Sequence, residues 1–182
     1  MQRVVFYSWQ SDLPNRTNRS FIQTALEKVA DAIRVDDTVN VEPIVDRDTL
    51  GVAGSPDIGK TIFEKIERAD VFVADITLIN ISEEGNRRTP NPNVLLELGY
   101  ALHALGTSRV ILIFNKAYGD IEDLPFDLRM RRVMTYNMPE LAEERSTERR
   151  ILEAKLDDAI RTALANIQPT PASSLVSQTL EG

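Results

Sequence analysis

The sequence predicts an α/β domain in which a five-stranded parallel sheet carries helices on both faces, the doubly wound (flavodoxin-like) arrangement. Two observations support this: short apolar runs alternate with amphipathic segments along the chain, and polar turns separate them. Such alternation is typical of parallel strands joined by right-handed helical crossovers. The common strand order is 2-1-3-4-5, and ligands then bind outside the carboxyl ends of strands one and three.

The five strands are predicted from apolar runs that are rich in β-branched and aromatic residues. They are expected at residues 4–7, 39–45, 70–75, 110–114 and 133–136. Between the third strand and the next helix, residues 79–89 have the polar composition of a mobile loop. Residues 124–132 are expected to form a short irregular or helical connection.

Four helices are predicted from apolar residues that recur every three or four positions. They are expected at residues 21–33, 55–69, 92–105 and 147–165. Ser55 followed by Pro56 suits a helix start, and Gly106 suits a helix end. The inner faces of the first and last helices are expected to hold Phe21, Ala25, Val29 and Ala32, and Ile151, Leu152, Leu156, Ile160 and Leu164.

Length and composition restrict both organisation and chemistry. The 182 residues fit one domain, expected at 1–166, and a disordered tail or linker at 167–182. The absence of cysteine excludes disulfides and thiolate catalysis, and His103 is the only histidine, so no metal site is expected. No signal-peptide or membrane-spanning pattern is present, which predicts a cytoplasmic protein. A net charge of −7 argues against a nucleic-acid partner.

Polar side chains follow the predicted strands and are expected to meet at the carboxyl edge of the sheet. Ser8, Trp9 and Gln10 follow the first strand, Arg47 the second and Asp75 the third. Trp9 has two interpretations, stacking on a nicotinamide or adenine ring or covering the edge of the core. Arg47 suits a phosphate, or else an ion pair with a neighbouring aspartate. Ser8 suits a hydrogen bond to ribose or phosphate, or a loop cap.

Glu97 is the leading catalytic candidate because it interrupts an apolar stretch of the third helix. Helices that are apolar on nearly every side are usually buried, and a buried carboxylate loses hydration, so its pKa is expected to rise. Asn93 and Tyr100 lie within one turn and are expected to share its face. The alternative is a solvated glutamate at the rim of the helix.

Two other motifs have simpler explanations. Residues 54–61 fit the P-loop pattern G-x-x-x-x-G-K-T, but Asp57 would repel phosphate, and Ser55 with Pro56 already explains the segment as a helix start. Asp46 and Asp48 have the ligand chemistry for Mg²⁺, although a polar loop accounts for both.

The chain resembles bacterial TIR-like domains, a group whose fold is similar to that of nucleoside deoxyribosyltransferases. The resemblance extends from about residue 3 to residue 165, and its most specific block is NPNVLLELGYA at residues 91–101. Further matches are YSWQSD at 7–12, DRDT at 46–49, ADVFVADIT at 69–77 and LPFD at 124–127.

This resemblance implies hydrolysis of NAD⁺ to nicotinamide and linear or cyclised ADP-ribose, in bacterial antiviral defence or toxic signalling. It places the essential glutamate at Glu97 and implies no cofactor beyond NAD⁺, or a related nucleotide, as substrate. It also implies a homo-oligomer formed through the loop at residues 46–57, with a sensor domain or partner protein as activator. Two alternatives stay open: a non-catalytic nucleotide-binding or self-assembling module, and a nucleoside ribosyl- or deoxyribosyltransferase.

Overall fold

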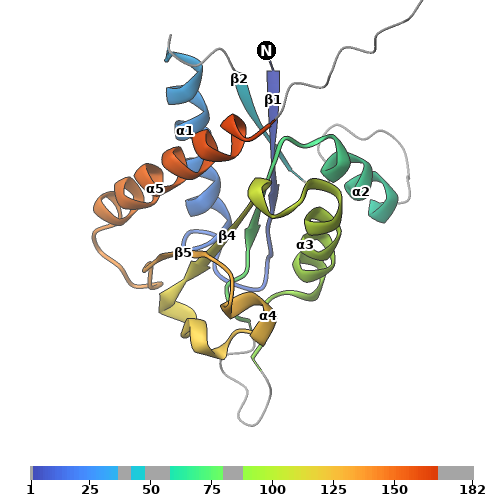
Figure 1. The fold of residues 1–182 in the computed structure, drawn as a ribbon. Coiled ribbons are helices and arrows are strands. Elements are labelled where there is room, and N and C mark those ends of the chain that lie inside the picture. The colour runs from blue at the N-terminus through green and yellow to red at the C-terminus, as the bar shows by residue number, and fades with distance from the viewer. Residues whose placement is uncertain (1, 37–41, 48–57, 80–87, 168–182) are drawn as a thin grey trace, which may run out of the picture.

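The structure is a computed structural model, which describes residues 2–36, 42–47, 58–79 and 88–167. Its centre is a five-stranded sheet in the order β2-β1-β3-β4-β5, and every pairing is parallel (Figure 1). The strands are β1 (Gln2–Ser8), β2 (Glu42–Arg47), β3 (Val71–Asp75), β4 (Val110–Asn115) and β5 (Val133–Tyr136). The predicted fold class and strand order are therefore confirmed. The switch between β1 and β3 marks the edge where a ligand is expected.

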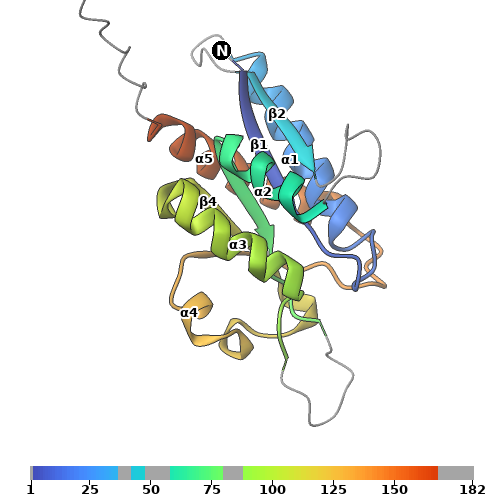
Figure 2. The same ribbon diagram turned by 90° about the vertical axis from the view of Figure 1, so that its right-hand side faces the viewer.

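Helices cover both faces of this sheet (Figures 1 and 2). On one face, α1 (Arg19–Arg34) and α5 (Ser146–Ala165) pack over the odd-numbered side chains of β1 and β3, such as Val5 and Val73. On the other face, α2 (Ile58–Arg68) and α3 (Pro92–Leu105) pack over even-numbered side chains such as Phe6 and Phe72. Two apolar layers therefore enclose β1, β3 and β4, as their nearly continuous apolar sequences require.

Short elements complete the connections. They are the 3₁₀ turns η1 (Thr107–Arg109), η2 (Lys116–Tyr118) and η3 (Ile121–Asp123), and the helix α4 (Phe126–Arg129). Gly106 ends α3 with a φ of 75°, and Gly119 follows η2 with a φ of 143°. Residues other than glycine rarely adopt these backbone conformations. The sequence predicted a short irregular or helical connection at 124–132, where α4 forms, and η2 and η3 were not predicted.

The structure corrects several details of the predicted elements. Phe21, Ala25 and Val29 are on the inner face of α1 as predicted, but Ala32 is exposed, and Ala30 and Ile33 are buried in its place. Ile151 of α5 is 43% exposed, because the helix turns it away from the core that Leu152 and Leu156 enter. Ile79 and Thr89, at the ends of the predicted polar loop, pair in an antiparallel bridge.

Some predictions concern residues that are not described. The tail at 168–182, most of the loop at 46–57 and the proposed helix start at Ser55 lie outside the described residues. Among the helices of the described ranges, none combines the length and apolar character needed to cross a membrane. The described α2 begins at Ile58, and Gly59 to Thr61 of the P-loop-like motif form its first turn.

Candidate active site

A cleft of about 380 Å³ opens beside the carboxyl end of β1. Its walls come from the loop after β1, from α2 and from the first turns of α3. The lining residues are Trp9, Gln10, Ser11, Gly59, Ile62, Phe63, Asn91, Asn93, Leu96 and Glu97. The sequence placed four of these, Trp9, Gln10, Asn93 and Glu97, in one crevice. Its volume lies within the roughly 300–1,000 Å³ that is usual for ligand pockets.

Glu97 lines this cleft and is hydrogen-bonded to Ser8, which is buried at the end of β1. The Ser8 hydroxyl donates a hydrogen bond of 2.5 Å to Oε2 of Glu97. Ser8 is the last residue of β1 and shares the sheet face of Phe6, so its side chain meets α3 rather than α1. The apolar run suggested a fully enclosed Glu97, but the side chain is only half-buried because it faces the open cleft, which the 63% exposed Leu96 also lines.

The start of α3 fixes the direction in which Glu97 points. Asn91 is the N-cap: its Oδ1 accepts hydrogen bonds from the backbone N–H groups of Asn93 at 2.8 Å and Val94 at 3.3 Å. Pro92 occupies the first helical turn, where its missing N–H costs nothing. Val94 and Leu98 anchor the inner side of the helix in the core, which leaves Glu97 on the side of the cleft.

Gln10 links the cleft to a buried carboxylate. Its Oε1 accepts hydrogen bonds from the backbone N–H groups of Asp12 at 2.7 Å and Leu13 at 2.9 Å, and its Nε2 faces Oδ2 of Asp75 at 3.4 Å. Gln10 therefore shapes the loop that forms one wall. Oδ2 of Asp12, in the same loop, accepts a hydrogen bond of 2.7 Å from Nδ2 of Asn91.

The sequence predicted that Asp75 would lie in the ligand crevice, but Asp75 does not line the cleft. It belongs to the odd-numbered side of β3, which faces α1, whereas Ser8 and Glu97 lie on the α3 side. Thr77 donates to its Oδ1 from both the backbone N–H at 3.1 Å and the hydroxyl at 2.6 Å, and Asn18 donates to Oδ2 at 3.1 Å. Burial raises the pKa of Asp75, and the hydrogen bonds from Thr77, Asn18 and Gln10 oppose that rise.

Asn115 extends this buried polar network across β4. Its side chain donates to the carbonyl oxygens of Thr17 and Met138 and to Oδ1 of Asn18 at 3.0–3.3 Å, and its Oδ1 accepts from the backbone of Met138 at 2.9 Å. The Tyr136 hydroxyl adds a bond of 2.8 Å to the Thr17 carbonyl. Nothing in the sequence pattern pointed to Asn115, since the end of an apolar strand is an ordinary place for asparagine.

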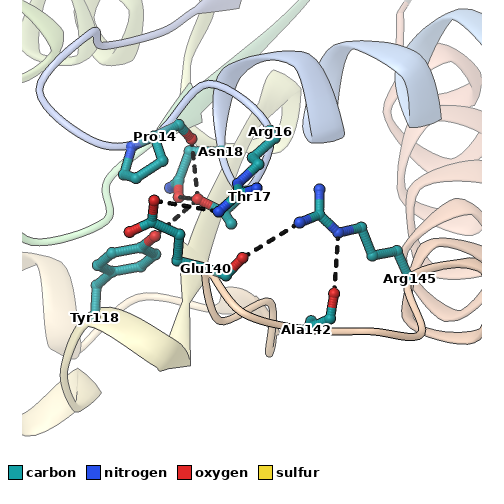
Figure 3. Close-up of polar contacts among 8 residues, drawn as sticks. All are labelled: Pro14, Arg16, Thr17, Asn18, Tyr118, Glu140, Ala142 and Arg145. Carbon is teal, nitrogen blue, oxygen red and sulfur yellow. Dashed lines mark hydrogen bonds and ion pairs between the residues drawn. The ribbon is translucent and has the colours of Figure 1, made fainter.

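Residues from two other segments also contact the turn before α1 (Figure 3). The hydroxyls of Thr17 and Tyr118 lie 2.8 Å apart, and Arg16 forms an ion pair of 3.2 Å with Glu140. Arg145 in turn donates to the Glu140 carbonyl oxygen at 3.3 Å. Connections from η2 and from the segment before α5 thus fix the far end of the loop that begins with Trp9.

Trp9 has both of the surroundings that were weighed from sequence. It lines the cleft, and it also packs against the core beneath α1. The guanidinium carbon of Arg19 lies 3.4 Å from the centre of the Trp9 ring, a cation–π contact. The side of the ring that Arg19 covers is therefore closed to a base.

Tyr100 and Arg47 complete the predicted set. Tyr100 lies outside the cleft in an adjoining groove with α2, where its ring stacks on Phe63 at 4.4 Å and its hydroxyl donates to Glu67. The hydrogen bond to that carboxylate raises the pKa of Tyr100. Arg47 ends β2, and its side chain is outside the described atoms.

Metal binding was not expected, and the described ranges contain no group of three or more acidic or histidine side chains that would hold an ion. Asp46, one half of the pair considered for Mg²⁺, forms an ion pair of 3.0 Å with Lys65, and Asp48 lies outside the described residues. His103 is exposed on the last turn of α3, away from the residues that line the cleft.

Comparisons with known proteins bear on the family. A search of curated proteins gave no match. Among solved structures, a 2-desoxiribosyltransferase from Leishmania mexicana is 16% identical, covering 72% of this chain and 89% of its own, with a TM-score of 0.45. A family model described as "CAP12/Pycsar effector protein, TIR domain" matches residues 20–130, which include β3, α3 and Glu97. The chain therefore belongs to the TIR-domain family of CAP12/Pycsar effector proteins.

Proposed function

We propose that this domain hydrolyses the N-glycosidic bond of NAD⁺, or of a related nicotinamide nucleotide, with Glu97 as the catalytic carboxylate. One observation carries the proposal: Glu97 lies in a cleft beside the switch point of the sheet, with one oxygen held at 2.5 Å by Ser8. A carboxylate held in this way has a defined direction, which is the requirement for stabilising charge that develops in a transition state.

The reaction needs few protein groups. The bond between ribose C1′ and the pyridinium nitrogen breaks, and its electron pair neutralises the nicotinamide ring, so no general acid is required. Positive oxocarbenium character develops on the ribose, where a carboxylate stabilises it as in glycosidases. A water oxygen then bonds to C1′, and its proton passes to Glu97 or to solvent. One carboxylate is therefore enough, in agreement with a cleft that contains no histidine.

The remaining walls suit the two parts of such a substrate. Ile62, Phe63 and the exposed Leu96 form an apolar wall from α2 and α3, which matches a planar ring. Asn93 is exposed at the cleft and offers an amide to ribose hydroxyls or to the carboxamide of nicotinamide. We assign the apolar wall to the leaving base and the Ser8–Glu97 pair to the ribose.

Self-association and location complete the proposal. We propose that the domain is active as a homo-oligomer formed through residues 46–57, most of which lie outside the described residues. A sensor domain or partner protein would drive that association. We place the reaction in the cytoplasm, in agreement with a sequence that contains no cysteine.

The test is Glu97→Gln with purified protein and NAD⁺, with products separated by chromatography. Glutamine keeps the size of the side chain and an acceptor for Ser8 but removes the charge, so nicotinamide release should fall by roughly 10²–10³-fold. Release at the wild-type rate would refute the proposal. Transfer of the ribose to an added base, in place of hydrolysis, would favour the transferase alternative, and inactive wild-type protein that binds nucleotide would favour the non-catalytic module.

A further inference from the structure

The hydrogen bond between Asp12 and Asn91 joins the loop after β1 to the start of α3, and both of these segments contribute residues to the cleft. Asp12 belongs to the loop after β1 and is exposed, and Asn91 is the N-cap of α3. The 2.7 Å bond runs from Nδ2 of Asn91 to Oδ2 of Asp12. Because a charged acceptor receives it, this bond is stronger than an ordinary exposed one.

This bond decides how the Asn91 amide is oriented. With its Nδ2 directed to a carboxylate, Asn91 can only present Oδ1 to the helix, and Oδ1 is the atom that accepts from the backbone of Asn93 and Val94. If the amide turned over, an NH₂ group would face two N–H donors. Asp12 therefore keeps the N-cap of α3 in its working orientation.

The Asp12 loop is itself tied to the buried network. Gln10 receives the backbone N–H groups of Asp12 and Leu13, and its amide is oriented by Asp75. Gln10 is 2% exposed, so this arrangement is shielded from water. A continuous series of contacts thus runs from Asp75 through Gln10 and Asp12 to Asn91 and the first turn of α3.

We infer that Asp12 is a positioning residue, which holds the start of α3 so that Glu97 stays aligned with Ser8. Glu97 lies less than two turns after Asn91 along α3, so a shift of the helix start moves the carboxylate relative to β1. Misplacement of a catalytic group by a small distance costs rate rather than binding. The expected loss of rate rests on the proposed function, whereas the expected loosening of the start of α3 does not.

The kinetic test compares Asp12→Ala with Asp12→Asn in nicotinamide release. Alanine removes the acceptor, so kcat should fall about fivefold with KM changed less than about twofold, whereas asparagine retains an acceptor oxygen and should restore most of kcat. Asp31→Ala is the matched control, because Asp31 is also exposed and accepts a 2.7 Å bond, from Arg34 near the other end of α1.

A second variant tests the partner. Asn91→Ser keeps a capping oxygen for α3 but loses the donor to Asp12, so it should show the same loss of kcat as Asp12→Ala. If the two residues act through one bond, the double variant is no slower than either single variant. Additive losses, or a failure of Asp12→Asn to rescue, would overturn the inference.

Amide hydrogen exchange followed by NMR gives a readout that does not depend on activity. In Asp12→Ala the protection of the Asn93 and Val94 amides should fall about fivefold, with no change in Asp12→Asn or Asp31→Ala. Unchanged protection in Asp12→Ala would overturn the positioning role. Wild-type protein that released no nicotinamide would instead refute the proposed function, and the exchange result alone would then decide the positioning role.

Discussion

Ser8→Ala isolates the contact on which the proposed site depends. Alanine removes the hydroxyl that donates a hydrogen bond of 2.5 Å to Glu97, and it leaves no buried donor without a partner. A hydrogen bond to a charged group contributes about 1.5–3 kcal/mol. Because Glu97 is only half-buried, solvent takes over part of the interaction, and the lower end of that range applies.

Converted to a rate, about 1.5 kcal/mol corresponds to roughly a tenfold loss of kcat/KM, if the contact is fully used in the transition state. The free energy of unfolding should fall by about 1 kcal/mol, a change of about 2–4 °C in Tm for a chain of this size. Nicotinamide release and thermal unfolding, measured on the same preparation, give both quantities.

The matched control is Ser146→Ala. Its hydroxyl also donates to a glutamate, Oε1 of Glu144 at 2.6 Å, but at the exposed start of α5 and outside the cleft. It should leave kcat/KM unchanged. If Ser8→Ala retained wild-type kcat/KM, Ser8 would not position the catalytic carboxylate, and the assignment of the Ser8–Glu97 pair to the ribose would be wrong.

Two further predictions concern stability. Burial raises the pKa of Asp75, so the contribution of Asp75 to stability is largest below its unfolded pKa and is lost as the pH rises through its folded pKa. In urea titrations, the free energy of unfolding of wild type relative to Asp75→Asn should therefore decrease with pH across that window. An increase would mean that the hydrogen bonds to Asp75 outweigh its burial. Gly119→Ala should lower the free energy of unfolding by about 2–3 kcal/mol, because φ is 143° and a Cβ would lie 2.9 Å from Cδ1 of Leu78. Gly106→Ala, with a φ of 75° and open space around the position, should lower it by about 1 kcal/mol. Equal losses in the same titrations would contradict this account.

Much of the fold was predictable because its signals are local. Apolar runs specify strands such as Val71–Asp75, and the Asn-Pro pair at residues 91–92 specifies the start of α3 to the residue. The strand order followed from a general rule about alternating strands and helices. Glu97 was proposed as the candidate because a charged residue in an apolar helix is unusual in any context, and a cleft at this edge of the sheet was expected from the topology.

The side chains around Glu97 were less predictable, because a residue's place after a strand does not reveal which face of the sheet it joins. Asp75 was grouped with Ser8 on sequence order, but the register pairs Ser8 with Ala74, so Asp75 falls on the α1 face. Counting the two-residue alternation from Phe72 would have shown this. Tyr100 was assigned by helical spacing alone, and the position of α2 directed it to Glu67 instead.

The sequence by itself determined the α/β class and the parallel sheet and proposed Glu97 as the candidate, because these depend on residue type and on periodicity along the chain. Only the tertiary structure decided that Ser8 donates to Glu97, that Gln10 joins the loop to Asp75, and that Asp12 accepts from Asn91. Hydrogen bonds between residues 65–89 positions apart depend on how strands and helices pack in three dimensions, and no periodicity within one segment encodes that distance.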